Sequence, residues 1–417
     1  MKNNVKNLIE FIDHCPSCFH VIENARKQFL EHGFMELKEK EYWDLEEGKS
    51  YFVTRNGSSI IAFHLPKKDF QGFHIVASHS DSPTYRIKEQ PEMSVEKHYT
   101  KLNIERYGGM IPETWFDRPL SVAGRIIIEE NGQIKDQLVN IDRDLMIIPN
   151  LAIHMSRSSN ESKQLNPQKD LLPLCGGNLT KDGFEEMIAK ESGVEKEDIL
   201  SYDLFLYNRM RGTTLGINEE FVAAPKLDDL ECAYSSIEGM LNAKLSKDYV
   251  TVCAVFDNEE VGSGTKQGAG STFFPEVLKR ISYLCGKNEE EYYMAVADSF
   301  MLSADNAHAV HPNYQDKTDP TNRPYINEGI VLKYNASQKY TTDANSAALV
   351  KYLCKKEKIK CQVFFNRSDM LGGSTLGNIL TGQVSIKAAD IGLPQLAMHS
   401  PYETAGVKDT EYLIRVA

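Results

Sequence analysis

The sequence has no apolar run near the roughly 20 residues that a helix needs to cross a bilayer. Its first residues, MKNNVKNLIEFIDHC, lack the apolar core and small-residue cleavage site of a secretory signal. A basic excess is also missing, because 59 Asp and Glu outnumber 47 Lys and Arg and give a formal net charge of −12. Such a chain repels nucleic acid and anionic membranes. We therefore expect a cytoplasmic protein that binds neither nucleic acid nor membrane.

Cysteine is sparse, and its pattern is not that of a disulfide framework. Two of the eight cysteines, Cys253 and Cys361, lie in apolar strand-like runs, where we expect buried, reduced thiols. Cys15 and Cys18 have the spacing of a redox or zinc pair, but no second pair and no preceding strand accompany them. The segment is better interpreted as the start of a helix, with Ser17 as its cap.

The composition is that of an ordinary globular protein, with 41% hydrophobic and 25% charged residues in 417. This length predicts about two domains. After residue 224, strand-like runs alternate with helical ones, and the strand-like runs are DYVTVCAVFD, EEYYMAVADSF, IKCQVFFN and QVSIKAADIG. The alternation predicts an α/β domain, residues 1–87 and 224–417, with a central mixed, mostly parallel sheet.

The segment between these two parts, residues 88–223, has a different pattern. Its alternating run SVAGRIIIEENGQI and the turn signal Asn131-Gly132 predict β-structure. The polar stretch SRSSNESKQLNPQKD has the composition of an exposed loop. We expect an inserted β-rich dimerisation domain, because strand edges need to be covered.

Acidic and histidine side chains follow several of the strand-like segments. Open α/β sheets bind ligands outside the carboxyl ends of their strands, so residues far apart in the sequence meet there. The candidate set is His79, Asp81, Asp228, Glu259, Glu260, Asp305 and His399.

Two histidines and five carboxylates without a cysteine suit zinc or a related divalent ion at a catalytic site. Five carboxylates that converge without a cation repel one another. A pair of metal ions that share one bridging carboxylate removes this conflict and recurs in aminopeptidases. Any one of these residues alone is more often a cap or a loop residue, so the joint pattern carries the hypothesis.

Five runs of the sequence resemble those of the aspartyl aminopeptidase family of co-catalytic zinc peptidases: HSDSPTYRIK, KLDDL, DNEEVGSGTKQGAGS, SADNAHAVHPNY and AMHSPYE. They occur in the family's order between residues 79 and 403. The resemblance implies a zinc-peptidase-like fold and an aminopeptidase that releases single N-terminal residues from peptides, with a preference for Asp or Glu. It also implies two divalent ions per chain, Zn²⁺ or else Co²⁺ or Mn²⁺, and self-association into a dodecamer built from dimers.

The same resemblance implies roles for individual residues. His79 and Asp305 would bind the first metal ion, and Glu260 and His399 the second. Asp228 would bridge the two ions; the neighbouring Asp229 competes for that role, and the family pattern favours Asp228.

The resemblance also implies the residues that act on the substrate. Glu259 would be the general base, and Asp81 would orient the imidazole of His79. Lys333 would face the substrate's first side chain. His154, from the inserted block, would bind substrate in a neighbouring subunit's site.

Two other interpretations remain open. If the chain binds the same metal ions as the family but has a different substrate pocket, it would be a broad or neutral-residue aminopeptidase, or a deacylase of the same architecture. It would be a non-catalytic assembly subunit if the fold alone is kept. The presence of Glu259 and the complete ligand set argues against the assembly subunit.

Overall fold

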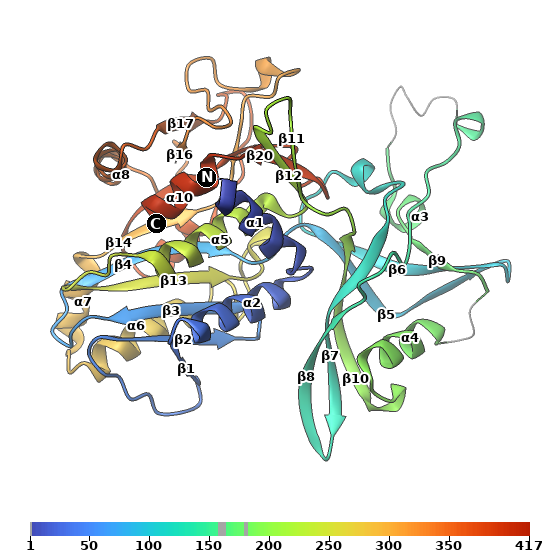
Figure 1. Cartoon of the computed structure of the whole chain (residues 1–417), viewed down its shortest axis with the longest axis horizontal. Helices are drawn as coiled ribbons and strands as arrows, with labels where there is room; N and C mark the ends of the chain where they lie inside the picture. The colour runs from blue at the N-terminus through green and yellow to red at the C-terminus, as the bar shows by residue number, and fades with distance from the viewer. Residues whose placement is uncertain (1, 157–163, 179–181) are drawn as a thin grey trace.

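The computed structural model describes residues 2–156, 164–178 and 182–417. These residues form two lobes that lie side by side (Figure 1). One lobe contains a nine-stranded and a five-stranded sheet, and the other a six-stranded sheet. Within the described ranges, none of the helices has both the length and the apolar character needed to span a membrane.

The nine-stranded sheet is the centre of the larger lobe. Five of its eight neighbouring strand pairs are parallel and three are antiparallel. The α/β class with a mixed, mostly parallel sheet is thereby confirmed. In order across the sheet, the strands are β1 (Met35–Leu37), β2 (Lys49–Arg55), β3 (Ser59–Leu65), β13 (Tyr249–Phe256), β4 (Gly72–His79), β14 (Phe300–Ala304), β18 (Lys387–Gly392), β16 (Ile330–Tyr334) and β17 (Cys361–Phe365).

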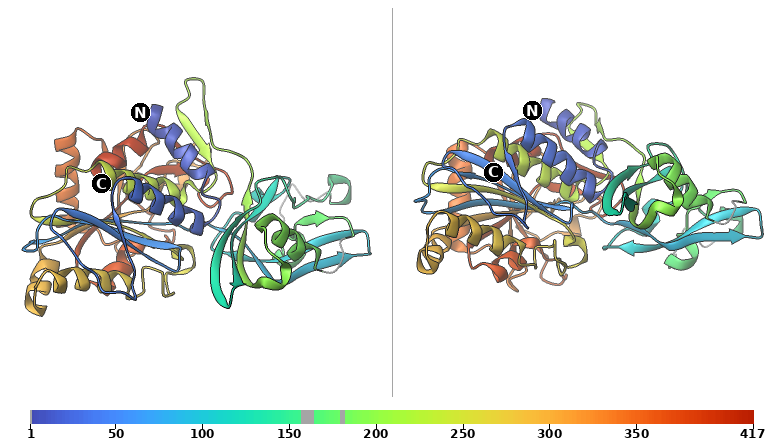
Figure 2. Two further views of the ribbon diagram at one scale, coloured as in Figure 1. Left: turned by 60° about the horizontal axis from the view of Figure 1, so that its bottom comes forward. Right: turned by 90° about the horizontal axis from the view of Figure 1, so that it is seen from below.

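Helices cover both faces of this sheet (Figure 2). Because successive side chains of a strand point to opposite faces, Ile60 and Ala62 of β3 join one core cluster while Ile61 and Phe63 join the other. The first cluster includes residues of α1 (Lys2–Asp13), α2 (Cys18–Glu31), α5 (Leu227–Asn242), α8 (Ala344–Glu357) and α10 (Asp409–Val416). The second includes residues of α6 (Phe273–Leu284), α7 (Glu289–Ala297) and α9 (Leu376–Gln383).

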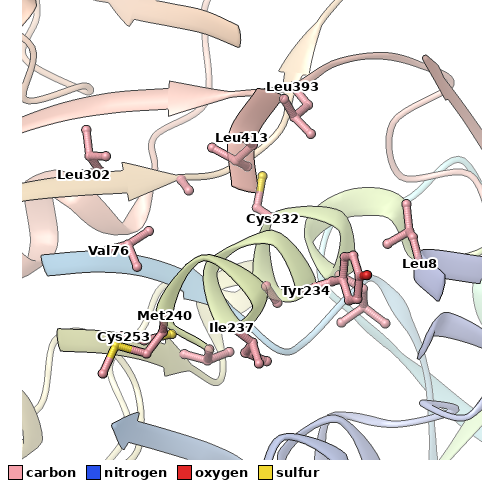
Figure 3. Packing of buried hydrophobic residues seen from close by; sticks show 14 of the residues in the cluster. Leu8, Val76, Cys232, Tyr234, Ile237, Met240, Cys253, Leu302, Leu393 and Leu413 are labelled. Carbon is pink, nitrogen blue, oxygen red and sulfur yellow. The ribbon is translucent and has the colours of Figure 1, made fainter. Parts of the chain in front are cut away.

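Helix α5 packs in the first of these layers, and Figure 3 shows its buried side. Its side chains Cys232, Ile237 and Met240 belong to one cluster with Cys253 of β13 and Leu413 of α10, and all five are at most 3% exposed. Truncation of such a residue to alanine typically costs about 2–5 kcal/mol of stability. This packing anchors α5, and with it Asp228 at the start of the helix.

One sequence-based expectation is wrong. The run EEYYMAVADSF, expected to be a strand, is mostly helix α7, and the strand β14 begins only at Phe300. A capping box starts the helix: the Asn288 side chain accepts from the Glu291 backbone at 2.9 Å, and Glu291 accepts from the Asn288 backbone at 2.7 Å. Three glutamates in the first turn also interact favourably with the helix dipole.

The segment between Cys15 and Cys18 starts α2, as expected. Ser17 occupies the N-cap position, but its hydroxyl bonds the ring of His20, with Oγ and Nδ1 2.8 Å apart, and caps no backbone N–H. All eight cysteines are free thiols. A structural disulfide is therefore not part of this fold.

The smaller lobe has its own core around a six-stranded sheet in which all neighbouring pairs are antiparallel. Asn131 and Gly132 form the turn between β7 and β8, as the sequence predicts. Helix α4 (Gly183–Ser192) packs on this core. In order, the strands are β8 (Gln133–Asn140), β7 (Leu120–Glu130), β10 (Ile199–Asn208), β5 (Thr84–Val95), β6 (Tyr99–Tyr107) and β9 (Leu174–Gly176).

The strands of this sheet run from residue 84 to residue 208, whereas the inserted block was expected at 88–223. Residues 209–223 depart from the expectation, because β11 (Thr213–Leu215) and β12 (Phe221–Ala224) join the five-stranded sheet of the larger lobe. Residues 157–163, in the polar stretch expected to be an exposed loop, lie outside the described residues.

The five-stranded sheet joins distant parts of the chain next to the large sheet. Its order is β11, β12, β20 (Glu403–Gly406), β19 (Pro394–Leu396) and β15 (Ala307–His308). In the β12–β20 pair, Ala224 lies opposite Glu403. The segment that leads to Asp228 is thereby held beside the segment that follows His399.

Candidate metal centre

Three adjacent parallel strands carry the first group of site residues at their carboxyl ends. His79 ends β4, and its partner in the register is Phe256, the last residue of β13. Glu259 and Glu260 follow in a 3-10 turn, η4 (Glu259–Val261). In β14, Ser303 pairs with Ala77, so Asp305 reaches the level of His79. The register of the sheet thus places these side chains at one edge, as expected from the strand ends.

Asp228 and His399 come to the same edge from the five-stranded sheet. Asp228 has non-helical backbone angles, φ −85° and ψ 107°, so it belongs to the turn that leads into α5. His399 lies between β19 and β20 with φ +68°. Glu403 holds both segments: its Oε2 accepts from the Asp228 N–H at 2.9 Å, and its Oε1 accepts from the His399 N–H at 2.6 Å.

The structure brings the five proposed metal ligands together in two groups that share Asp228, and a third group joins His79 and Glu260 with Glu259. His79, Asp228 and Asp305 each offer an atom within 4.8 Å of the others, and Asp228, Glu260 and His399 do the same. The His399 Nε2 lies 3.3 Å from Asp228 Oδ2 and 3.5 Å from Glu260 Oε1. The His79 Nε2 lies 3.9 Å from Asp228 Oδ1. Asp228 is the member that the two groups share.

The donor set fits divalent cations. Asp228 is 4% exposed, and within the described residues its Oδ1 has no hydrogen-bond donor. A buried carboxylate oxygen without a donor is costly unless a cation faces it. Asp229 Oδ1 is also without a donor, but Asp229 Oδ2 accepts from the His79 N–H at 3.1 Å, and Asp229 belongs to neither group. The geometry therefore favours Asp228 as the shared ligand.

Asp81 organises the residues around it and is 3% exposed. Its backbone oxygen lies 3.1 Å from His79 Nδ1, and a carbonyl can only accept, so Nδ1 carries a proton and Nε2 is the nitrogen that the neutral imidazole would offer to a metal ion. Its side-chain oxygens accept from the backbone N–H groups of Glu259 and Glu260 at 3.1 and 3.2 Å. Asp81 therefore orients the His79 ring and also fixes the turn that carries both glutamates.

The electrostatics of the group show how crowded its negative charges are. Burial raises the pKa of Glu259 to about 8, and the charges of Asp305 and Asp81 add to the effect. Burial and the charge of Asp228 likewise raise the pKa of Glu260 well above its usual range. Burial opposes the charged form of His79, yet nearby acids raise the pKa of its imidazole well above the ordinary value. Bound cations reverse such shifts by stabilising the carboxylates.

Lys333 and His154 occupy different surroundings. Lys333 of β16 is 2% exposed, and its Nζ donates to Asp305 Oδ1 at 3.0 Å and to the Asn306 carbonyl at 2.8 Å. Lys333 is therefore a buried residue of the sheet and not a surface lysine. His154 lies in a short 3-10 turn, η2 (Ile153–Met155), on the smaller lobe and is exposed. Among the described residues, it belongs to none of the histidine and carboxylate groups.

Sequence reasoning missed Glu403, although it lies in the run AMHSPYE. A glutamate four residues after a histidine carries no signal of its own. Its role follows from the pairing of Ala224 with Glu403, which brings the backbone of Asp228 within reach. Burial and the charge of Asp228 raise the pKa of Glu403 well above the usual range.

Comparison with known proteins identifies the family. The family model described as aminopeptidase I zinc metalloprotease (M18) matches residues 11–416. This chain belongs to the M18 family. A probable M18 family aminopeptidase 2 of Clostridium novyi is 46% identical and is aligned over 100% of this chain and 98% of its own length. A protein of the same name from Pseudomonas aeruginosa is 37% identical over 99% of this chain and 96% of its own.

Solved structures agree with this assignment. Ape4, in its complex with Nbr1, superposes with a TM-score of 0.96 at 37% identity, over 100% of this chain and 84% of that one. The prApe1 structure gives 0.93 at 28% identity, over 99% and 93%. The S. cerevisiae mApe1 dodecamer gives 0.87 at 27% identity, over 100% and 96%. The protein is a zinc-dependent aminopeptidase, a metalloexopeptidase, as its sequence motifs predict.

Proposed function

We propose that this M18 aminopeptidase holds two divalent ions, most readily Zn²⁺, in the two groups that share Asp228. His79 and Asp305 would complete the first group, and Glu260 and His399 the second. The observation that carries the proposal is the placement of Asp228, buried and with an oxygen that no donor in the described residues satisfies. Co²⁺ or Mn²⁺ would suit the same nitrogen and oxygen donors.

When bound, the ions supply Lewis acidity, which polarises the scissile carbonyl and makes water a better nucleophile. Glu259 takes the proton of the attacking water and returns it to the departing amine. Without bound cations, burial raises the pKa of Glu259 to about 8; the positive charge of two ions would lower this pKa again and leave the carboxylate free to accept a proton. Asp81 keeps the His79 Nε2 directed at the carboxylates.

We infer a preference for peptides with N-terminal Asp or Glu from Lys333. Its ammonium group is buried beside Asp305 and lies 5.4 Å from the centre of the Tyr340 ring. An ammonium has three N–H donors, and the described contacts use two of them, with Asp305 and Asn306. The third donor would bond the carboxylate of an acidic substrate side chain.

One observation favours a second candidate, a broad or neutral-residue aminopeptidase or a deacylase. Asp305 already neutralises Lys333 at 3.0 Å, which would leave the pocket without net positive charge. A panel of Asp, Glu, Leu and Ala aminoacyl substrates and an N-acyl amino acid, each with a chelator control, separates the candidates. Acidic selectivity requires a larger kcat/KM for the Asp and Glu substrates; chelator-insensitive turnover would contradict the two-metal proposal itself.

We also propose that the six-stranded lobe mediates self-association into a dodecamer built from dimers, and that His154 binds substrate in a neighbour's site. Supporting this, His154 is exposed and stands apart from its own chain's described metal groups, and the related mApe1 is a dodecamer. A cytoplasmic location belongs to the same proposal and suits eight free thiols. Light scattering tests the assembly: a fully active monomer at assay concentration would contradict it.

A further inference from the structure

The chain that follows β6 leaves the smaller lobe and lies against the candidate metal centre. Gly108 has φ +77°, and a Cβ placed there would lie 3.1 Å from the Cβ of Glu260. A Cβ at Gly109 would lie 3.8 Å from His399 Nδ1, and the N–H of Ile111 donates to the His399 carbonyl at 3.1 Å. Gly108 thus lets the backbone pass close to Glu260, and the residues after it lie beside His399.

Tyr107, the last residue of β6, makes the most specific of these contacts. Its hydroxyl donates to Asp81 Oδ2 at 2.7 Å and accepts from Asn258 Nδ2 at 2.8 Å. Its ring packs edge-on against Phe205 of β10, with centroids 5.6 Å apart, so the smaller lobe fixes the ring. Tyr107 therefore joins the sheet of one lobe to the acid that organises the site in the other.

The direction of these hydrogen bonds is determined by the neighbours of Asn258. The Asn258 Oδ1 accepts from Thr265 Oγ1 and from Gln267 Nε2, both at 2.7 Å. Its amide nitrogen must then face the oxygen of Tyr107, and a nitrogen of this kind can only donate. The proton of the Tyr107 hydroxyl is left to bond the Asp81 carboxylate.

We propose that Tyr107 is a positioning residue of the peptidase that acts through the Asp81 carboxylate on the turn of Glu259 and Glu260 and on His79, whose Nδ1 lies 3.3 Å from Asp81 Oδ1. The proposal rests on the two-metal function proposed above. Asp81 has one oxygen beside the Glu259 N–H and the other shared by the Glu260 N–H and Tyr107. Without the hydroxyl, the Asp81 carboxylate loses the side-chain donor that fixes Oδ2. The smaller lobe therefore sets the geometry of its own chain's metal centre, in addition to any role in assembly.

The test compares Tyr107→Phe with Tyr202→Phe. Tyr202 of β10 is a matched control: it is 6% exposed in the same lobe, and its hydroxyl donates to the Lys88 carbonyl at 2.8 Å, away from the site. Partners of metal-binding residues typically change metal affinity or activity by about 10–100-fold when removed. For Tyr107→Phe, and not for Tyr202→Phe, we expect a loss of this size in zinc affinity, measured by competition with a chelating dye. We expect a similar loss in kcat, with little change in KM. Equal effects of the two variants would overturn the proposal.

A double-mutant cycle identifies the path of the effect. If Tyr107 acts through Asp81, Tyr107→Phe should reduce zinc affinity and kcat no further when Asp81→Ala is already present. Independent, multiplying losses would show that Tyr107 does not act through Asp81 and would overturn the proposal. A wild-type enzyme whose turnover ignores zinc and chelators would instead contradict the two-metal function, so the two failures are distinguishable.

Discussion

Replacement of Lys333 by methionine tests two proposals: that a metal ion lies beside its partner Asp305, and that its ammonium group selects acidic substrates. The substitution keeps the length and apolar stem of the side chain and removes both the bond to Asp305 Oδ1 and the bond to the Asn306 carbonyl. Asp305 is 8% exposed, so the variant leaves a buried carboxylate without its lysine. Breaking a buried ion pair from one side typically costs about 3–5 kcal/mol.

A divalent ion at Asp305 would compensate most of that cost. We therefore expect Lys333→Met to lower the melting temperature clearly in metal-free protein and much less in protein saturated with zinc, because zinc binding stabilises the native state. Differential scanning fluorimetry with and without zinc measures the difference. Lys351→Met is the control, since Lys351 is an exposed lysine of α8. An equal loss of melting temperature in both metal states would refute the placement of a metal ion at Asp305.

The same variant tests specificity. A hydrogen bond to a charged group contributes about 1.5–3 kcal/mol, or roughly ten- to a hundredfold in kcat/KM. Lys333→Met should reduce the ratio of kcat/KM for Asp over Leu substrates by that factor. A wild-type enzyme that prefers Leu or Ala would refute the acidic preference and leave the metallopeptidase mechanism intact.

Two further predictions concern buried acids. Glu259→Gln should keep both metal ions, as measured by elemental analysis, and lower kcat by at least about 100-fold; loss of metal would show that Glu259 is a ligand.

Glu231 accepts from Thr410 Oγ1 at 2.6 Å, and burial raises its pKa from 4.5 to about 8. The folded state holds this proton longer than the unfolded state, so the stability linked to it is lost as pH rises from about 4.5 to 8. Glu231→Gln should gain melting temperature over wild type between pH 5 and 8, by the equivalent of about 3 kcal/mol at pH 7; a constant difference across that range would contradict the assignment.

The parts of the fold and site that follow local rules could be predicted from the sequence. An apolar run predicts β13, the Asn131-Gly132 signal predicts the turn between β7 and β8, and polar residues after strands predict the edge where His79 and Asp305 meet. The apolar run of α7 is too short to tell a helix from a strand, and the signal that marks the helix is the capping pattern of Asn288 and Glu291 at its start.

The missed contacts depend on pairings that no local pattern contains. Glu403 reaches the Asp228 backbone across 175 residues because of one register between β12 and β20. Tyr107 reaches Asp81 only because the smaller lobe docks beside the large sheet. The burial of Lys333 likewise depends on the tertiary structure, because no local pattern around a lysine shows which elements will cover it.

Anomalous scattering at the zinc absorption edge, from crystals soaked in excess zinc, tests the central claim most directly. Two peaks per chain are predicted, one beside His79 and Asp305 and one beside Glu260 and His399, each about 2.0–2.2 Å from its ligand nitrogen and oxygen atoms. Both peaks should contact the carboxylate of Asp228. A single peak, no peak, or a pair of peaks that does not share Asp228 would contradict the two-metal account.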